Sequence, residues 1–159
     1  MEDIAGHPNV RAVEAALRAA GITPDVRVLE HTAPTAAAAA EQIGCTVAAI
    51  ANSLVFDADG SPLLVLTSGA HRVDTAKLAA QLGVARIARA TPEFVRTHTG
   101  QVIGGVAPLG HPAPIRTLID ESLAHHDPLW AAAGHPSTVF ALTYAQLVTV
   151  TGGEPVAVN

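Results

Sequence analysis

The sequence is poor in cysteine, aromatic residues and long apolar runs, and each shortage excludes a class of protein. Cys45 is the only cysteine among 159 residues, so no internal disulfide framework exists and a reducing compartment, the cytoplasm, is expected. Aromatic residues make up only 3%, so the core must be built from Ala, Val, Leu and Ile. No apolar run approaches the roughly 20 residues of a membrane helix, and the acidic start lacks a signal-peptide pattern. We therefore expect no membrane partner.

Positive charge is also scarce. Nine Lys and Arg residues stand against fourteen Asp and Glu residues, which gives a formal net charge of −5, and Lys77 is the only lysine. A chain with this balance is not expected to bind DNA or RNA through a broad basic face. Binding of a nucleic-acid end in a small local pocket stays open.

The composition and the pattern of apolar residues predict one folded domain over residues 1–159. Hydrophobic residues make up 49% and charged residues 14%, which argues against disorder. Periodicity and capping residues predict helices over 9–20, 35–43, 74–82, 91–100 and 143–150. Alternating or short apolar runs predict strands over 25–31, 50–56, 63–67, 85–88, 117–119, 128–133, 138–142 and 156–158. This mixed order favours an α+β fold around a mixed, largely antiparallel sheet.

Common catalytic motifs are missing. The chain has no GxGxxG after a strand, no GxxxxGK[ST], no HExxH and no GxSxG. The densest histidine group, His125–His126–Asp127, is interpreted as solvated loop residues, with metal ligation by one histidine as the alternative. Cys45 has no partner at a ligand spacing and is interpreted as a packing residue. We expect neither a metal nor a cofactor.

A loop rich in glycine and proline, residues 101–114, is the most informative segment. It contains Gly104 and Gly105 shortly before Pro108. Glycine permits a positive φ and lets a ligand approach the bare backbone, and successive N–H groups can form a donor site for a carbonyl or an oxyanion. An ordinary structural turn is the alternative interpretation.

The same loop carries a resemblance to a known family. GGVAPLGHPAP resembles the signature loop of the YbaK/EbsC (ProX-like) aminoacyl-tRNA deacylases, relatives of the editing insertion domain of bacterial prolyl-tRNA synthetase. LEHTAPT, IANSLVF, LLVLTSGAHRVDTAKLAAQLG, ATPEFVRTHTG and the C-terminal segments resemble family segments in the same order, over residues 25–158. The resemblance implies a single editing domain with helices around a mixed, barrel-like sheet.

The family's activity implies roles for particular residues. Family members hydrolyse the ester between a wrong amino acid and the 3′ end of tRNA, after an error by an aminoacyl-tRNA synthetase that cannot reject a similar amino acid strongly enough. The resemblance places catalytic roles on Asn52, Gly104, Gly105 and Pro108. It places substrate binding on His31, Ser53, Ser68, Gly134 and His135. The implied partners are the aminoacyl-tRNA 3′ end and a synthetase.

The sequence departs from the family at position 52, where Asn stands in the place of the usual strand lysine. An amide is a neutral donor and acceptor and cannot act as a point charge on a phosphate. Loss of one charge-assisted contact costs about 1.5–3 kcal/mol, which weakens activity without abolishing it. Arg72 could supply charge near the site or simply pair with Asp74. Lys77 is interpreted as structural.

Three hypotheses follow from the sequence. The first is a trans-acting aminoacyl-tRNA deacylase with a variant pocket. The second is a non-catalytic module of the same fold that binds a tRNA end or a protein, motivated by the missing lysine. The third is a hydrolase of another small acyl ester, motivated by the acidic net charge. The first depends on Asn52 and the peptide groups at 104–105 facing one cavity.

Overall fold

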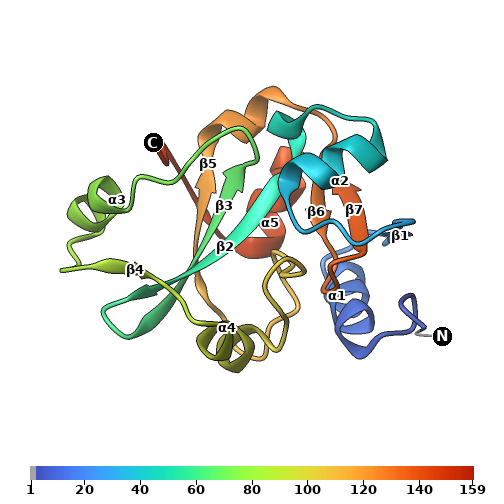
Figure 1. Cartoon of the computed structure of the whole chain (residues 1–159), viewed down its shortest axis with the longest axis horizontal. Coiled ribbons are helices and arrows are strands. Elements are labelled where there is room, and N and C mark those ends of the chain that lie inside the picture. The colour runs from blue at the N-terminus through green and yellow to red at the C-terminus, as the bar shows by residue number, and fades with distance from the viewer. Residues whose placement is uncertain (1–2) are drawn as a thin grey trace.

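The computed structural model describes residues 3–159 as an α+β arrangement of two sheets with helices around them (Figure 1). The larger sheet has the order β4-β2-β3-β5-β8, with bounds Ile87–Arg89, Ala51–Ala58, Ser61–Ser68, Arg116–Asp120 and Glu154–Val156. The smaller sheet has the order β1-β7-β6, with bounds Arg27–Val28, Thr138–Leu142 and Leu129–Ala132. Among the strands of residues 3–159, β3–β5 and β5–β8 pair in parallel and the other pairs are antiparallel. The predicted α+β class and mixed sheet are confirmed, and over the described residues the two sheets do not close into a barrel.

Each helix begins and ends where local chemistry dictates. The five α-helices are α1 Pro8–Ala19, α2 Ala36–Ile43, α3 Thr75–Leu82, α4 Pro92–Thr99 and α5 Tyr144–Thr151. Side chains of Thr35, Asp74, Thr91 and Thr143 accept the free N–H groups at the starts of α2 to α5. Left-handed glycines end the same four helices, namely Gly44, Gly83, Gly100 and Gly152. Two short 3-10 helices, η1 Val47–Ala49 and η2 Glu121–His125, complete the set.

The β2–β3 hairpin forms the centre of the molecule. Its inner residues Leu64 and Leu66 are fully buried against the main core, which also contains Ile119, Phe140 and Leu147. The opposite face packs in a second cluster with α3 and β8. In Figure 1, α3 and β4 lie on one side of this hairpin and β6 and β7 lie on the other.

One edge of β2 stays open along half of its length. β4 pairs only with Phe56–Ala58 of β2, whereas β3 pairs with all of it. On the other side of the gap, Ile50 forms an isolated bridge with Trp130 of β6. The segment 51–55 therefore presents an unpaired edge between β4 and β6, and this edge positions the site described below.

Most predicted elements are confirmed within one or two residues, and one differs clearly. The strand expected over 25–31 is reduced to Arg27–Val28, because only these residues find a partner, in β7. Loop 101–114 contains no helix or strand, as expected. No helix within residues 3–159 has the length and apolar character needed to cross a membrane.

Candidate functional site

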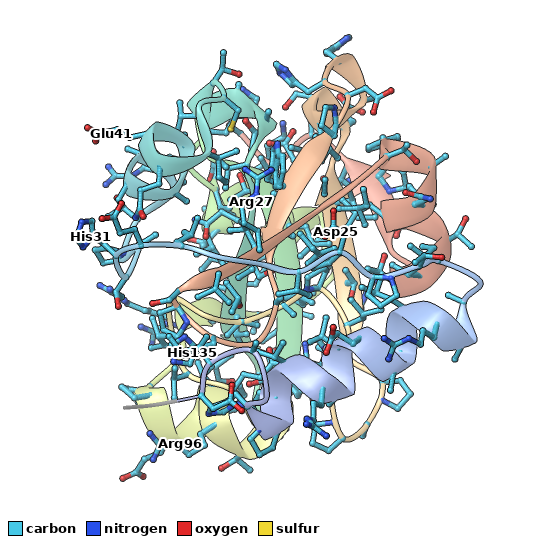
Figure 2. The ribbon with its side chains drawn as sticks, turned by 90° about the vertical axis from the view of Figure 1, so that its right-hand side faces the viewer. Asp25, Arg27, His31, Glu41, Arg96 and His135 are labelled. Atoms are coloured by element: carbon cyan, nitrogen blue, oxygen red, sulfur yellow. The ribbon has the colours of Figure 1, made fainter. Side chains whose placement is uncertain are left out.

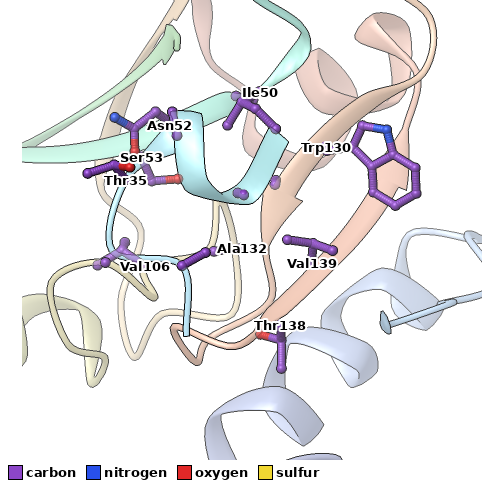
Figure 3. A pocket seen from close by; sticks show the side chains of 15 residues that line it. Thr35, Ile50, Asn52, Ser53, Val106, Trp130, Ala132, Thr138 and Val139 are labelled. Carbon is purple, nitrogen blue, oxygen red and sulfur yellow. The ribbon is translucent and has the colours of Figure 1, made fainter. Parts of the chain in front are cut away.

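Two hollows meet at the open edge of β2 and share four wall residues. The smaller has a volume of about 50 Å³ and the larger about 540 Å³. The shared wall residues are Asn52, Ser53, Gly104 and Val106. Figure 3 shows the smaller hollow, with Asn52 and Ser53 near Thr35 and Val106. The structure thus brings the amide of Asn52 and the backbone of Gly104 to one place.

The position of Asn52 and Ser53 follows from strand geometry. Successive side chains of a strand point to opposite faces, and directly paired residues share a face. Ser53 pairs with Leu66 on the core side, whereas Asn52 pairs with Thr67 on the other face. Both can line the same hollows because the hollows wrap around the unpaired edge of β2. No hydrogen bond joins the Asn52 side chain to another residue of the described chain, so its amide can serve a ligand.

A tight turn presents the backbone of Gly104 to the same hollows. The Gly105 N–H donates to Val102 O at 3.0 Å, and Gly104 has a φ of 89°. A positive φ at the third position is the mark of a type II turn and favours glycine. Within residues 3–159, neither the Gly104 N–H nor the Val106 N–H has a protein acceptor. Both residues line the hollows, so these two N–H groups are the candidate donors to a carbonyl oxygen.

Buried polar side chains fix this loop from below. Gln101 is 1% exposed, and its Oε1 accepts from the Ala107 N–H at 2.8 Å. The Thr99 hydroxyl donates to Val95 O and accepts from the Gln101 N–H. Gln101 and Ala107, which flank the turn at Gly104, are thereby held to each other and to the end of α4. The turn at Gly104 therefore has a rigid support.

The walls of the smaller hollow are made mainly of small apolar side chains. These include Ala33, Ala36, Ala39, Ile50, Ala131, Ala132 and Val139. Trp130 closes one side and is stacked under Arg27, whose guanidinium carbon lies 4.8 Å from a ring centroid. The Ser53 hydroxyl is buried in the wall and finds no partner among the described residues. Such a group costs about 1–3 kcal/mol unless a ligand satisfies it.

The larger hollow combines apolar walls with two positive charges. Leu54, Phe56 and Ile87 supply apolar surface, and Arg72 and Arg89 supply the charge. The described lining of both hollows contains no Asp, Glu, His, Lys, Cys or Tyr. The pair of hollows can therefore orient a ligand and donate hydrogen bonds to it, but its lining offers no side chain for use as a general base.

The glycine–proline segment divides between the site and its support. Gly105 has its N–H engaged in the turn, and a Cβ there would lie 2.7 Å from Pro136 N, so it is a packing glycine. Pro108 is buried and lines a separate hollow beside His111. The Gly105 N–H is therefore engaged within the turn, whereas the Val106 N–H has no acceptor among residues 3–159, and Pro108 lines neither hollow of the candidate site; catalytic roles for Gly105 and Pro108 stay predictions.

His31 and Ser68 also lie away from the candidate site. His31 is exposed in the turn before α2, where its backbone makes two hydrogen bonds with the Gln42 side chain (Figure 2). Ser68 is buried, and its hydroxyl donates to Ala48 O at 2.9 Å. Neither residue lines either hollow, and the expectation that they bind substrate stays a prediction.

Gly134 and His135 belong to a contact with the start of α1. Gly134 has a φ of 97°, and a Cβ there would lie 2.9 Å from Asn9 O. The His135 Nδ1 accepts from the Ser137 N–H at 3.0 Å, and its ring meets the His7 ring edge-on at 5.4 Å. Figure 2 shows His135 beside this helix. Neither residue lines the hollows, and their predicted substrate contacts stay predictions.

Other expectations from single residues have clear outcomes. Lys77 is structural, since its Nζ donates to Asn159 O at 2.7 Å. No ion pair joins Arg72 to Asp74 in the described chain. Cys45 packs against a hydrophobic cluster that includes Ala39 and Ala40 of α2, and burial raises the pKa of its thiol. Within residues 3–159, no three His, Cys, Asp or Glu residues are grouped so as to hold a metal.

Sequence reasoning missed Val106 and Arg89 as site residues. Val106 lies inside the glycine–proline loop, but only the turn geometry shows that its N–H is the available one. Arg89 comes to the larger hollow because β4 pairs Arg89 with Phe56. The local sequence does not predict that Arg89 pairs with Phe56.

A buried carboxylate anchors the segment that leads from β3 to the larger hollow. Asp120 is 1% exposed and accepts from the Ser68 N–H at 2.9 Å, the Ser122 hydroxyl at 2.7 Å and the Ser122 N–H at 3.0 Å. His71 Nδ1 lies 2.8 Å from its Oδ2. Burial raises the pKa of Asp120, but the hydrogen bonds from Ser122, Ser68 and His71 together hold that pKa below its usual value. Because Asp120 is the last residue of β5, its contact with His71 fixes the backbone next to Arg72 relative to β5.

Comparison with known proteins places this geometry in a family. Residues 30–150 match the model of the aminoacyl-tRNA editing domain. The chain belongs to the aminoacyl-tRNA editing domain family. The uncharacterized protein YwhH of Bacillus subtilis strain 168 is 31% identical over 124 residues, which cover 77% of this chain and 78% of YwhH.

Relatives of this editing domain also occur inside larger proteins. Proline–tRNA ligase of Nitratidesulfovibrio vulgaris strain DP4 is 30% identical over 121 residues, 76% of this chain but 20% of the ligase. The crystal structure of a candidate trans-editing enzyme for prolyl-tRNA synthetase superposes with a TM-score of 0.90 at 36% identity, covering 96% of this chain and 98% of that one. The editing domain described here thus spans about a fifth of the ligase and nearly all of the other structure.

Proposed function

We propose that residues 1–159 form one editing domain that acts in trans and hydrolyses the ester of a mischarged aminoacyl-tRNA in the cytoplasm. The observation that carries the proposal is the shared wall of the two hollows, where the Asn52 amide and the unpaired N–H groups of Gly104 and Val106 meet. A small acyl pocket lies on one side of this wall, and a cavity of nucleotide size lies on the other. Membership in the editing-domain family supports the same conclusion.

The site suits an acyl group with a small side chain. A small hollow with alanine-rich walls favours a side chain such as that of alanine over branched or aromatic ones. The buried Ser53 hydroxyl offers a hydrogen bond to a polar group of the substrate, for example its amino group. Rejection of larger acyl groups by size is the second sieve that a synthetase pocket cannot provide by affinity alone.

In the proposed reaction, water attacks the ester carbonyl and the bond from the carbonyl carbon to the ribose oxygen breaks. The N–H groups of Gly104 and Val106 donate to the carbonyl oxygen, which gains negative charge in the transition state. Asn52 hydrogen-bonds the ribose or the attacking water and so orients them. Since the hollows have no titratable wall residue apart from the two arginines, the free hydroxyl of the substrate's terminal ribose relays the proton from water to the leaving oxygen.

A panel of mischarged tRNAs tests the proposal. The protein is incubated with prolyl-tRNA synthetase products and with other tRNAs that carry alanine, serine, cysteine, valine or proline, and release of the amino acid is followed. Faster release of the smallest amino acids than of valine is expected. If no amino acid is released faster than in buffer alone, the proposed activity is wrong and the protein is at most a binding module.

A matched pair of variants tests the assignment of the acyl pocket. Ala132→Leu adds three carbon atoms to the wall of the smaller hollow and should abolish deacylation by blocking the acyl group. Ala15→Leu makes the same change at an exposed position of α1 that lines neither hollow and should leave deacylation unchanged. If the two variants are equally active, the smaller hollow does not bind the acyl group.

A further inference from the structure

The larger hollow contains two arginines whose charge no carboxylate of the described chain neutralises. Arg72 and Arg89 both line it, and no acidic residue does. The only carboxylate–cation contact within 4.0 Å along residues 3–159 is that of His71 with Asp120. In a protein with a net charge of −5, an uncompensated pair of guanidinium groups in a cavity of about 540 Å³ is a local anion site.

The two arginines come from separate elements, and each backbone is fixed. Arg72 lies in the segment between β3 and α3, which is held by the contact of His71 with Asp120 and by the Asp74 N–H on Val158 O at 2.7 Å. Arg89 is held by its register opposite Phe56 on β2. Figure 1 shows α3 and β4 together on the same side of the hairpin. Two separately anchored backbone segments thus place Arg72 and Arg89 in the wall of one hollow.

The apolar walls between the arginines define the rest of the ligand. Leu54 and Phe56 share a sheet face with Arg89, because alternate residues of β2 point the same way and Phe56 pairs with Arg89. Ile87 extends this surface from β4. A flat, weakly polar group can pack on such a surface while an attached anion reaches a guanidinium, which binds phosphate with two parallel hydrogen bonds. A nucleotide has this combination.

We propose that Arg72 and Arg89 bind the phosphate of the terminal nucleotide of the substrate, and so supply from the segment before α3 and from β4 the charge that Asn52 cannot supply from β2. This inference rests on the proposed function, because the acyl end of that nucleotide lies at the shared wall formed by Asn52 and Gly104. Arg72 and Arg89 are substrate-positioning residues, since they hold the phosphate and do not touch the ester. They raise affinity for any correctly sized acyl group alike.

The test uses two stable ligands that differ by one phosphate. These are 3′-deoxy-3′-(alanylamino)adenosine, which has an amide in place of the ester, and its 5′-phosphate. Equilibrium binding is measured for the unmodified protein, for Arg72→Gln and for Arg89→Gln. Arg11→Gln removes the same charge from an exposed position on α1 that lines neither hollow and serves as the control.

The unmodified protein and Arg11→Gln should bind the phosphorylated ligand about tenfold more tightly than the other, as expected for a charge-assisted contact. Arg72→Gln and Arg89→Gln should each lose most of this difference and bind the unphosphorylated ligand unchanged. Equal binding of the two ligands by the unmodified protein, or an undiminished difference in both variants, overturns the inference. So does weaker binding of both ligands in a variant, which would indicate a structural role.

These outcomes are independent of the deacylation panel. If the panel shows no hydrolysis but the phosphate preference depends on the two arginines, the proposed enzyme activity fails and the phosphate site stands. If hydrolysis occurs and the preference is absent, the activity stands and the phosphate site is wrong.

Discussion

Position 104 shows how one residue type serves geometry and access together. Gly104 needs a positive φ for its turn, and a Cβ there would meet nothing within 4 Å. The adjacent Gly105 is required for the opposite reason, since a Cβ would collide with the backbone at residues 135 and 136. Two neighbouring glycines are thus required for separate reasons, one for the conformation of the turn in the wall of the hollows and one for packing.

Replacement of Gly104 by alanine should impair catalysis far more than folding. Gly104→Ala strains the turn by about 1–2 kcal/mol and moves the N–H donors, so we expect a loss of at least tenfold in kcat/KM for deacylation. The matched control is Gly60→Ala, because Gly60 has a φ of 92° and equally open surroundings but lies in the β2–β3 turn. Both variants should show a similar fall in the free energy of unfolding. If Gly104→Ala and Gly60→Ala have equal deacylation activity, Gly104 does not belong to the donor site.

The sequence predicts the site only in part, for reasons visible at single residues. Asn52 and Gly104 could be proposed because both stand inside recognisable segments of the family. His31, Ser68 and His135 could be proposed on the same ground, yet their side chains or backbones are used within the fold. Sequence position reports that a segment is near a site, whereas the direction of a side chain depends on pairing partners distant in the chain. Arg89 illustrates this, since only strand register brings it to the larger hollow.

At the scale of elements, the junction of β3, β5 and η2 depends on one carboxylate. Asp120 ends β5 and ties the end of β3 and the start of η2 to itself. The local sequence predicts both strands and the turn between β2 and β3. It does not predict that the parallel neighbour of β3 is β5, because that pairing is set by the packing of segments about fifty residues apart.

Asp120 should make stability depend on acid pH. Its pKa is lowered in the folded state, so its contribution to stability is complete above the ordinary value of about 3.9 and is lost as pH falls through the lowered folded value. Urea unfolding of the unmodified protein between about pH 5 and pH 3 should therefore show a falling free energy of unfolding. Asp120→Asn should cost about 1.5–3 kcal/mol at neutral pH and show a shallower fall. Parallel pH profiles for the two proteins would contradict this role.

At the scale of the whole molecule, charge argues for recognition of an end and not of a long RNA surface. The chain has a net charge of −5, and the site has two arginines. Length and composition are sufficient to predict a folded domain without a basic face. The placement of the few positive charges is a property of the tertiary structure and could not be predicted.

A short substrate should therefore serve nearly as well as complete tRNA. We expect kcat/KM for an alanylated acceptor-stem minihelix to lie within about threefold of that for alanyl-tRNA, because the proposed site binds only the phosphate of the terminal nucleotide. The logarithm of affinity should fall with the logarithm of salt concentration with a slope of about −0.7 for one phosphate contact to a single strand. A strong preference for the complete tRNA, or a much steeper slope, would require a second RNA-binding surface.

The single tryptophan of the chain, Trp130, stands in the wall of the smaller hollow with a guanidinium on its ring. Its emission is consequently a label-free optical signal of what enters that hollow. No other indole contributes background, so a titration or a stopped-flow trace would report arrival and departure of the acyl group directly.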